Sequence, residues 1–277
     1  MRIRFLKSII AISTVLVLAP VLLAQTAQQS AGGARAVKPT PKRDISGVWN
    51  RQAGDPSLSA IHSLSGVARG PGFVDMPPLT HWGQAKFDAT RPGYGIRQQP
   101  MGNDPILRCM PPGIPRLIWN GGEFAQLPGK MVEFLGSTWR QIATDGRPLK
   151  FDDAELRYDT GWMGVSVGRW EDDYTFVVES GGFSDQSWLS EEGLPHSDEM
   201  KLTERYTRTD YNTLLLNATI DDPKTYTQLY KVITVTFRLS PDRVRVATFC
   251  NADNENAFQE RIRSQAIKPG DAESNVK

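Results

Sequence analysis

Three strand–turn–strand units in the second half of the chain constrain its fold more than any other feature. They are Val165–Trp170 with Tyr174–Glu179, Met200–Thr209 with Thr213–Ile220, and Lys231–Leu239 with Arg243–Phe249. A short run of turn-forming residues joins the two strands of each unit. In the second unit every other residue from Leu214 to Ile220 is apolar, which is typical of a strand with one buried face. The pattern predicts a mainly β fold, an antiparallel meander that closes into a barrel or stays a curved sheet.

Residues 55–128 interrupt this pattern, because they hold eleven of the 19 prolines and many glycines. Proline lacks a backbone donor and breaks helices and strands, so we expect a long Pro/Gly-rich elaboration wrapped over the sheet. One short helix is predicted within it, over Thr80–Phe87, with Thr80 as the N-cap. Residues 44–277 are therefore expected to form a single β-rich domain.

The start of the chain predicts export. Residues 1–24 contain the basic side chains Arg2, Arg4 and Lys7, then an apolar run, then a small residue at Ala24, which is the order found in secretory signal peptides. A retained N-terminal anchor is the alternative. Residues 25–43 are rich in Ala, Gln, Gly and Pro and predict a flexible leader. We expect a periplasmic or secreted protein with no membrane span after signal cleavage.

The near balance of 32 basic and 31 acidic side chains disfavours nucleic acid or an anionic membrane as the partner. A small molecule or a protein surface fits better, and a homodimer is one such case. The two cysteines, Cys109 and Cys250, are expected to form a disulfide in an oxidising compartment. A nucleophilic thiol is the alternative to this pairing.

A short motif in the first expected strand bears on how the sheet closes. Gly47-Val48-Trp49 resembles the Gly-x-Trp opening of lipocalins. In that family the tryptophan closes one end of the barrel, and an arginine from a late strand packs across it. The resemblance implies a lipocalin-like barrel in which Arg243 or Arg245 is the packing arginine.

A longer set of motifs covers most of the chain after the leader. It consists of DISGVWNR, LTHWGQAKFDATRPGYG, NDPILRCMPPGIPR, RQIATDGRP, WMGVSVGRWEDDYTFVVES, GF-x-D-x-SWL, GLPHSDEMKLTERY and TIDDP-x-x-YT. In this order the motifs are similar to those of a large, mostly uncharacterised family of exported bacterial proteins. Val165 stands where many of those proteins carry histidine or tyrosine. The resemblance implies export but no particular activity, so function must be inferred from the residues.

The histidine in GLPHSDEMKLTERY has two interpretations. His196 can be a structural residue of a turn shaped by Pro195, Ser197 and Asp198. Alternatively, it is a general acid or base whose tautomer Asp198 fixes. Acidic, tyrosine and arginine side chains in nearby strands and loops extend the second interpretation to a proton-transfer site. Its candidate catalytic residues are His196, Asp198, Glu204, Tyr206, Asp145, Arg147 and Asp222.

Seven tryptophans are present, and most fall in or beside the expected strands, where core packing is their simplest role. If some of them face a barrel lumen, they form a flat-walled pocket suited to an aromatic or polycyclic ligand. The candidate ligand-binding residues are Trp139, Trp162, Trp170, Trp188, Tyr226 and Arg140.

Other chemistries have weaker support. The three histidines show no metal-ligand spacing, so no metal is expected. Ser166 fits the pattern G-x-S-x-G, but a β-hairpin follows it where the elbow of an α/β-hydrolase needs a helix. The sequence has no phosphate-binding glycine loop and no dinucleotide fingerprint, so no cofactor is expected.

Three hypotheses for function follow. The first is an exported protein that binds a small hydrophobic or aromatic molecule in a β-barrel pocket without chemistry. The second is a cofactor-independent lyase, isomerase or hydrolase that acts on such a compound by proton transfer between His196 and nearby acids. The third is an envelope assembly or interaction protein that uses the Pro-rich segment as its contact surface.

Export can be tested directly. We expect the protein in the periplasmic or secreted fraction to begin close to Gln25, because signal peptidase cleaves after small residues such as Ala24. Mass spectrometry of the N-terminal peptide measures this, and a chain that retains Met1 in the cytosol contradicts it.

Overall fold

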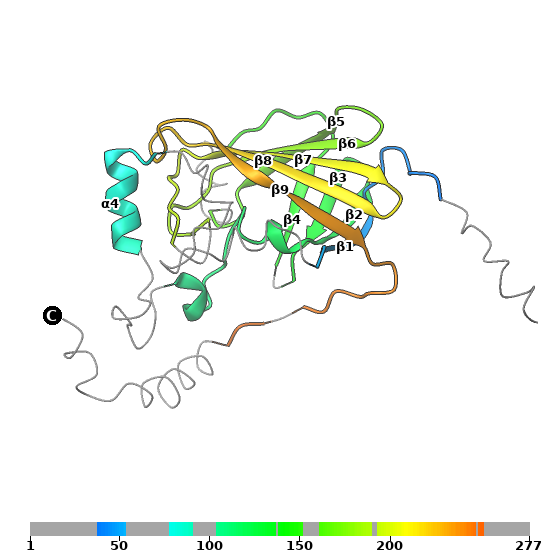
Figure 1. Ribbon diagram of the computed structural model, residues 1–277, viewed down its shortest axis with the longest axis horizontal. Coiled ribbons are helices and arrows are strands. Elements are labelled where there is room, and N and C mark those ends of the chain that lie inside the picture. The colour runs from blue at the N-terminus through cyan, green and yellow to red at the C-terminus, as the bar shows by residue number, and fades with distance from the viewer. Residues whose placement is uncertain are drawn as a thin grey trace, which may run out of the picture. The chain divides into compact units, whose positions relative to one another are not determined.

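Nine strands close into one β-barrel in the computed structural model, and they follow one another around the barrel in chain order (Figure 1). The structure describes residues 38–53, 78–90, 104–136, 138–151, 161–189, 193–247 and 249–251. The expected signal peptide, most of the leader and much of the Pro/Gly-rich elaboration lie outside these residues, so the structure does not test them. The prediction of a mainly β, lipocalin-like barrel is confirmed.

The strands are β1 Gly47–Arg51, β2 Glu123–Leu127, β3 Lys130–Phe134, β4 Trp139–Ala143, β5 Val165–Trp170, β6 Thr175–Gly181, β7 Lys201–Asp210, β8 Thr213–Asp221 and β9 Tyr230–Leu239. The first two predicted hairpins are present, since β5 pairs antiparallel with β6 and β7 pairs antiparallel with β8. β1 and β9 also pair antiparallel, and this pairing closes the barrel.

One neighbouring pair departs from the expected antiparallel meander. β4 and β5 run parallel, with Ile142 opposite Ser166 and Ala143 opposite Val167. Parallel neighbours need a crossover connection because a tight turn reverses the chain direction. Residues 144–164 separate the two strands and provide the length for that crossover. The barrel is therefore mixed.

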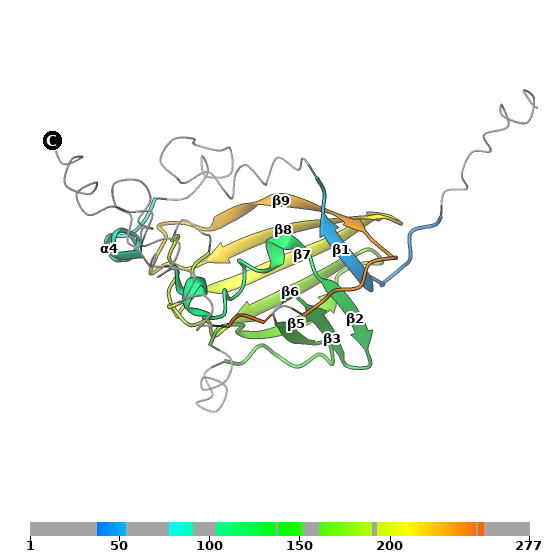
Figure 2. The same ribbon diagram turned by 90° about the horizontal axis from the view of Figure 1, so that it is seen from below.

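The third predicted hairpin is wrong in its second strand. The chain after β9 forms no strand among residues 243–247, and Val244 and Val246 are 85% and 76% exposed. β8 pairs along one edge of β9, and β1 pairs with Phe237–Leu239 on the other edge, where the returning strand of a tight hairpin would have to begin. The segment instead runs back past β1 and β2 (Figure 2).

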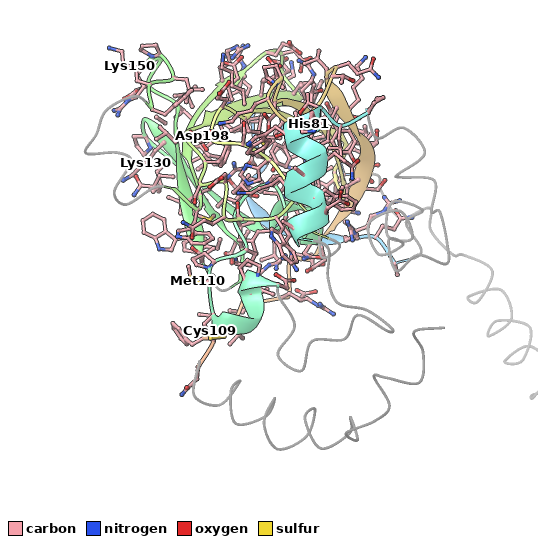
Figure 3. The ribbon with its side chains drawn as sticks, turned by 90° about the vertical axis from the view of Figure 1, so that its left-hand side faces the viewer. His81, Cys109, Met110, Lys130, Lys150 and Asp198 are labelled. Carbon is pink, nitrogen blue, oxygen red and sulfur yellow. A yellow bond between two sulfur atoms is a disulfide. The ribbon has the colours of Figure 1, made fainter. Side chains whose placement is uncertain are left out.

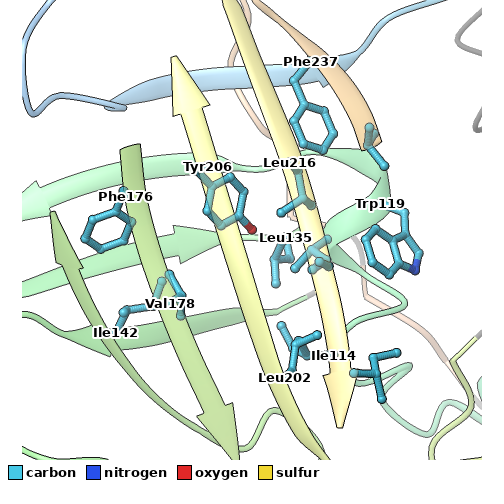
Figure 4. Packing of buried hydrophobic residues seen from close by; sticks show 14 of the residues in the cluster. Ile114, Trp119, Leu135, Ile142, Phe176, Val178, Leu202, Tyr206, Leu216 and Phe237 are labelled. Carbon is cyan, nitrogen blue, oxygen red and sulfur yellow. The ribbon is translucent and has the colours of Figure 1, made fainter. Parts of the chain in front are cut away.

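Inward-facing side chains fill the barrel. On β7 these are Leu202, Glu204, Tyr206 and Arg208, which alternate with more exposed residues as strand geometry requires. Phe176 of β6 and Leu216 of β8 lie opposite Tyr206, and the ring of Phe124 meets that of Tyr206 edge-on at 5.2 Å between centroids. Figure 4 shows this packing. The lumen formed by the described strands is a packed core.

Trp49 closes one end of the barrel, as the Gly-x-Trp resemblance implies. Its indole is buried and donates a hydrogen bond to the Ile45 carbonyl at 2.8 Å. The guanidinium of Arg208 lies over the indole at 5.1 Å and donates to the carbonyls of Asp44 and Tyr211. The packing arginine therefore comes from β7, because inward-facing Arg208 reaches the lumen end of that strand.

The prediction that Arg243 or Arg245 packs across Trp49 is wrong. These residues lie in the segment after β9, and Arg245 Nη2 donates to the Trp49 carbonyl at 3.0 Å and lies 3.5 Å from Asn50 Oδ1.

The predicted helix is α4, His81–Thr90, which lies on the side of the barrel away from β1 (Figure 1). Thr80 caps it as predicted, with Oγ1 accepting from the Gly83 amide at 3.0 Å. A β-bridge between Leu79 and Tyr226 ties the start of the helix to the connection between β8 and β9. Gly83 is required at this contact, because a Cβ there would lie 2.3 Å from the Thr225 carbonyl oxygen. Among the described residues, no helix combines the length and the apolar character needed to cross a bilayer.

The expected disulfide is present. Cys109 follows the short 3₁₀ helix η2, Pro105–Arg108, and bonds Cys250 after a sequence separation of 141 residues. Cys109 is labelled in Figure 3. A second 3₁₀ helix, η3 (Ile118–Asn120), leads into β2. The disulfide ties the segment after β9 to the described part of the Pro/Gly-rich elaboration.

Arg208 and Arg205 provide a matched test of the closed end. Arg208→Ala should lower the free energy of unfolding by about 2 to 4 kcal/mol, because it removes the stacked cation and leaves two carbonyls without their donor. Arg205→Ala on the outer face of the same strand breaks only an exposed ion pair with Glu171 and should cost less than about 1 kcal/mol. Urea unfolding of both variants measures the difference. Equal losses would contradict the role assigned to Arg208.

Candidate functional site

A buried ionic cluster spans the lumen between β3, β4 and β7. The Arg140 guanidinium donates from Nε to Glu133 at 2.6 Å, and from its two terminal nitrogens to both carboxylate oxygens of Glu204 at 2.8 and 2.5 Å. The Tyr206 hydroxyl donates to Glu204 at 2.7 Å. Glu133 and Arg140 are direct register partners in the β3–β4 hairpin, while Glu204 reaches them from across the barrel. One arginine therefore links strands on opposite sides of the lumen.

The cluster holds two carboxyl groups but one guanidinium. Burial raises the pKa of Glu133, the Arg140 cation opposes that shift, and the neighbouring Glu204 carboxylate adds to it. Burial alone would lower the pKa of Arg140, but the two carboxylates raise it well above its usual value. Arg140 therefore stays charged and pairs bidentately with Glu204, while Glu133 is the carboxyl whose ionisation leaves an excess buried negative charge.

The structure brings together three of the predicted site residues in this cluster. Arg140, Glu204 and Tyr206 satisfy one another inside the packed lumen. Glu133 was not among the residues predicted from the sequence. The available signal was that its strand pairs with the strand containing Arg140, which places the two side chains opposite each other. The arrangement gives these side chains a role in holding the barrel together.

A second polar cluster lies at the barrel end that carries α4, and we call it the loop-end cluster. It consists of Ser187, His196, Ser197 and Asp222. The distances are 2.7 Å from Ser187 Oγ to His196 Nε2 and 3.0 Å from His196 Nδ1 to the Ser197 carbonyl. Asp222 accepts from the Ser197 amide at 2.7 Å and from the Ser197 hydroxyl at 2.6 Å. Ser187 and His196 are 3% and 0% exposed.

The hydrogen-bond directions in the loop-end cluster follow from the chemistry of its atoms. A carbonyl oxygen only accepts, so His196 Nδ1 carries the hydrogen that Ser197 receives. Burial lowers the pKa of His196, so the ring is neutral and its Nε2 is an acceptor. The Ser187 hydroxyl therefore donates to Nε2 at 2.7 Å in preference to the Ser184 carbonyl, which lies 3.2 Å from the same oxygen. This is the direction in which a base polarises a hydroxyl.

Backbone and aromatic contacts hold His196 in place. The Tyr226 hydroxyl donates to the Pro195 carbonyl at 2.9 Å, and Phe183 meets the His196 ring edge-on at 6.3 Å between centroids. Thr225 donates its amide to Asp222 at 3.2 Å. Tyr226 thus contacts the residue that precedes the histidine, and Asp222 is linked to the histidine through Ser197.

The expected pairing of Asp198 with His196 is wrong. Asp198 lies on the surface at this end of the molecule and forms an ion pair with Lys224 at 2.9 Å (Figure 3). The Ser197 carbonyl takes the position at Nδ1 because it belongs to the residue next to the histidine, whereas the turn directs Asp198 to solvent. The tautomer is therefore fixed by the main chain.

Asp145 and Arg147 lie apart from both clusters. They form an exposed ion pair in the turn after β4, and hydrogen bonds from the Arg147 side chain and amide lower the pKa of Asp145 to about 2. They hydrogen-bond each other across Gly146, and no hydrogen bond or ion pair among the described residues joins either of them to His196.

The tryptophans do not line a common lumen. Trp139 is 53% exposed on the outer wall, because Arg140 and Ile142 take the inward positions of β4. Trp170 packs on Phe176 inside the barrel at 5.2 Å between centroids. Trp162 and Trp188 belong instead to loops near the loop-end cluster. Besides Trp170, the aromatic rings of this core include those of Trp49, Phe124, Phe176, Tyr206 and Phe237.

Ser187 is the residue of the loop-end cluster that sequence reasoning missed. It lies in the motif GF-x-D-x-SWL, where nothing local indicates that His196, nine positions later, returns to it. The serine that the sequence did single out, Ser166, faces the lumen and hydrogen-bonds Ser180 at 2.8 Å. A serine–histidine pair is thus present, at a position other than the G-x-S-x-G match.

Within the described ranges, no group of three or more His, Cys, Asp or Glu side chains could hold a metal ion. Comparisons of the chain with protein-family models, with curated proteins and with solved structures gave no significant match. A functional assignment therefore depends on the geometry of the two clusters.

The excess carboxyl of the lumen can be identified by pH. Glu133 has a higher pKa in the folded protein than in the unfolded chain. Its carboxyl therefore contributes stability at a pH below the pKa of the unfolded chain, and this contribution is lost as the pH rises through the pKa of the folded protein. Glu133→Gln should therefore raise the melting temperature at pH 8 by about 3 °C or more, with a smaller gain at pH 4.

Glu204→Gln is the matched control. It removes the carboxylate that pairs bidentately with Arg140, so it should destabilise the protein by about 3 kcal/mol at pH 8. Melting curves at the two pH values compare the variants. If Glu133→Gln is less stable than wild type at pH 8, the ionised Glu133 carboxylate stabilises the fold and the prediction is wrong.

Proposed function

We propose that this protein is exported and that it binds a small apolar or aromatic molecule at the loop end of its β-barrel. A β-barrel is compatible with a binding protein. The observation that carries the proposal is the convergence of Ser187, His196 and Asp222 on one buried cluster at an end of the barrel. Ligand sites commonly combine apolar walls with a few such polar groups, and barrel mouths are a usual place for them.

The packed lumen favours the loop end over the barrel interior. Tyr206, Phe176 and Phe237 are buried inside the barrel, and the Arg140 cluster crosses the same space. A ligand in the lumen would have to displace these groups. The loop end instead offers apolar side chains that are only partly buried, namely Leu79, Trp82, Trp162 and Met163.

The main chain at Gly113 also lies close to Ser187. Gly113 has φ 76°, and a Cβ there would lie 2.9 Å from both Ser187 Oγ and the Trp162 carbonyl. A glycine at this point lets the main chain approach both Ser187 and the Trp162 carbonyl. The ligand's apolar body would pack on Trp162 and its neighbours, and a polar group would reach the loop-end cluster.

Binding can be measured with intrinsic fluorescence and melting temperature. A panel of aromatic compounds should include members that quench fluorescence saturably and stabilise the protein, by about 2.7 kcal/mol at 100 times Kd. Trp188 adjoins Ser187, so Trp188→Phe should remove much of the quenching. Trp139→Phe on the outer wall is the matched control and should leave the quenching unchanged.

Two outcomes would contradict the proposal. One is the absence of any saturable response across the panel in protein that melts cooperatively. The other is quenching that depends on Trp139 and not on Trp188, which would place the ligand on the outer wall.

A further inference from the structure

We propose that Ser187 and His196 form a nucleophile–base pair that hydrolyses small esters at the loop-end cluster. This inference rests on the proposed function, since the ester would occupy the same small-molecule site. The pair is defined by the 2.7 Å contact between Ser187 Oγ and His196 Nε2, in which the hydroxyl donates. A hydroxyl becomes a useful nucleophile when an adjacent base takes its proton.

The histidine is oriented as a base requires. Its Nδ1 hydrogen is held by the Ser197 carbonyl at 3.0 Å, which leaves Nε2 directed at Ser187. Asp222 in turn holds Ser197 through that residue's amide and hydroxyl. The order nucleophile, base and orienting group is the arrangement that recurs in unrelated serine hydrolases. Here a main-chain carbonyl orients the base, and Asp222 acts through Ser197 as a positioning residue.

A buried hydroxyl beside Asp222 also points to a ligand. Thr225 is fully buried, and its Oγ1 has no hydrogen-bond partner among the described residues. Buried hydroxyls are nearly always satisfied, so one that the chain leaves unpaired is available to a polar group of a bound molecule. Thr225 adjoins the loop-end cluster, since its amide donates to Asp222 at 3.2 Å.

The reaction needs no metal or redox partner. Ser187 Oγ attacks the acyl carbon of the ester while its proton passes to His196 Nε2. The imidazolium then gives that proton to the leaving alkoxide as the bond from the acyl carbon to that oxygen breaks. Water deprotonated by Nε2 next attacks the acyl-serine, which releases the carboxylic acid and returns the proton to Ser187. The substrate class is an ester whose acyl or alcohol part is a small apolar or aromatic group.

Ser166 is an internal control for this assignment. It carries the G-x-S-x-G match, is buried like Ser187, and hydrogen-bonds the hydroxyl of Ser180 instead of a histidine. If burial or sequence pattern decided reactivity, the two serines would behave alike. If the histidine decides it, only Ser187 reacts.

The test uses the mature protein, a fluorophosphonate probe and p-nitrophenyl acetate. The probe should phosphonylate Ser187, as peptide mass spectrometry would locate, and p-nitrophenol should be released with an initial burst. Ser187→Ala should abolish both signals. His196→Gln, whose amide can still pair with Ser187, should slow both by about 100-fold or more. Ser166→Ala should leave both unchanged.

The outcomes separate this inference from the proposed function. An aromatic ligand that binds both wild type and Ser187→Ala, with adduct and turnover only in wild type, supports both. Binding of the ligand without an adduct at Ser187 overturns the inference that Ser187 is a nucleophile and still supports the proposed binding function. An adduct at Ser187 with no response to the aromatic panel supports the nucleophile and overturns the proposed ligand class. An adduct that persists at full rate in His196→Gln overturns the pair.

Discussion

The guanidinium of Arg140 is the interaction on which the rest of the barrel depends. It bonds Glu133 on the adjacent strand and Glu204 across the lumen, so its hydrogen-bond lengths set how closely β3, β4 and β7 approach. Buried charges are stable only when their partners are in place, and removing one partner leaves an uncompensated charge. The cluster therefore requires a narrow barrel, and aromatic and aliphatic side chains fill the space that remains. A wide lumen pocket of the carrier type is incompatible with this arrangement.

The two ends of the barrel differ in a way that separates stability from function. At one end Trp49 and Arg208 form a closed plug, in which the cation stacks on the indole and its nitrogens bond main-chain carbonyls. At the other end the connections into β7 and β9 meet α4 and bring side-chain polar groups together. Binding and catalytic groups are commonly carried by loops that a rigid scaffold positions. The plug and the Arg140 cluster supply that rigidity, and the loop end carries the hydrogen-bonded side chains of Ser187, His196 and Asp222.

Both polar clusters show how partners decide what a buried side chain does. Glu204 and Tyr206 are bonded within the lumen, so their acid and hydroxyl groups serve packing. Ser187 faces a neutral imidazole whose other nitrogen is occupied, and this directs its proton to Nε2. Asp198 and Asp145 pair with neighbouring cations at the surface and so leave the buried groups to one another. The same residue types thus take different roles according to burial and partner.

Local patterns in the sequence determined the strands of the first two hairpins and the Thr80 cap of the helix, because both follow from short-range periodicity and local motifs. They favoured the Trp49 closure through a three-residue resemblance, and a disulfide over a free thiol through the even number of cysteines. Only the tertiary structure decided that β1 pairs with β9, that β4 and β5 are parallel, and that Arg208 covers Trp49. It also decided that His196 pairs with Ser187 instead of Asp198. The physical reason is that these contacts join distant segments, and which segments meet depends on the free edges of the sheet and on the burial of charges across the whole barrel.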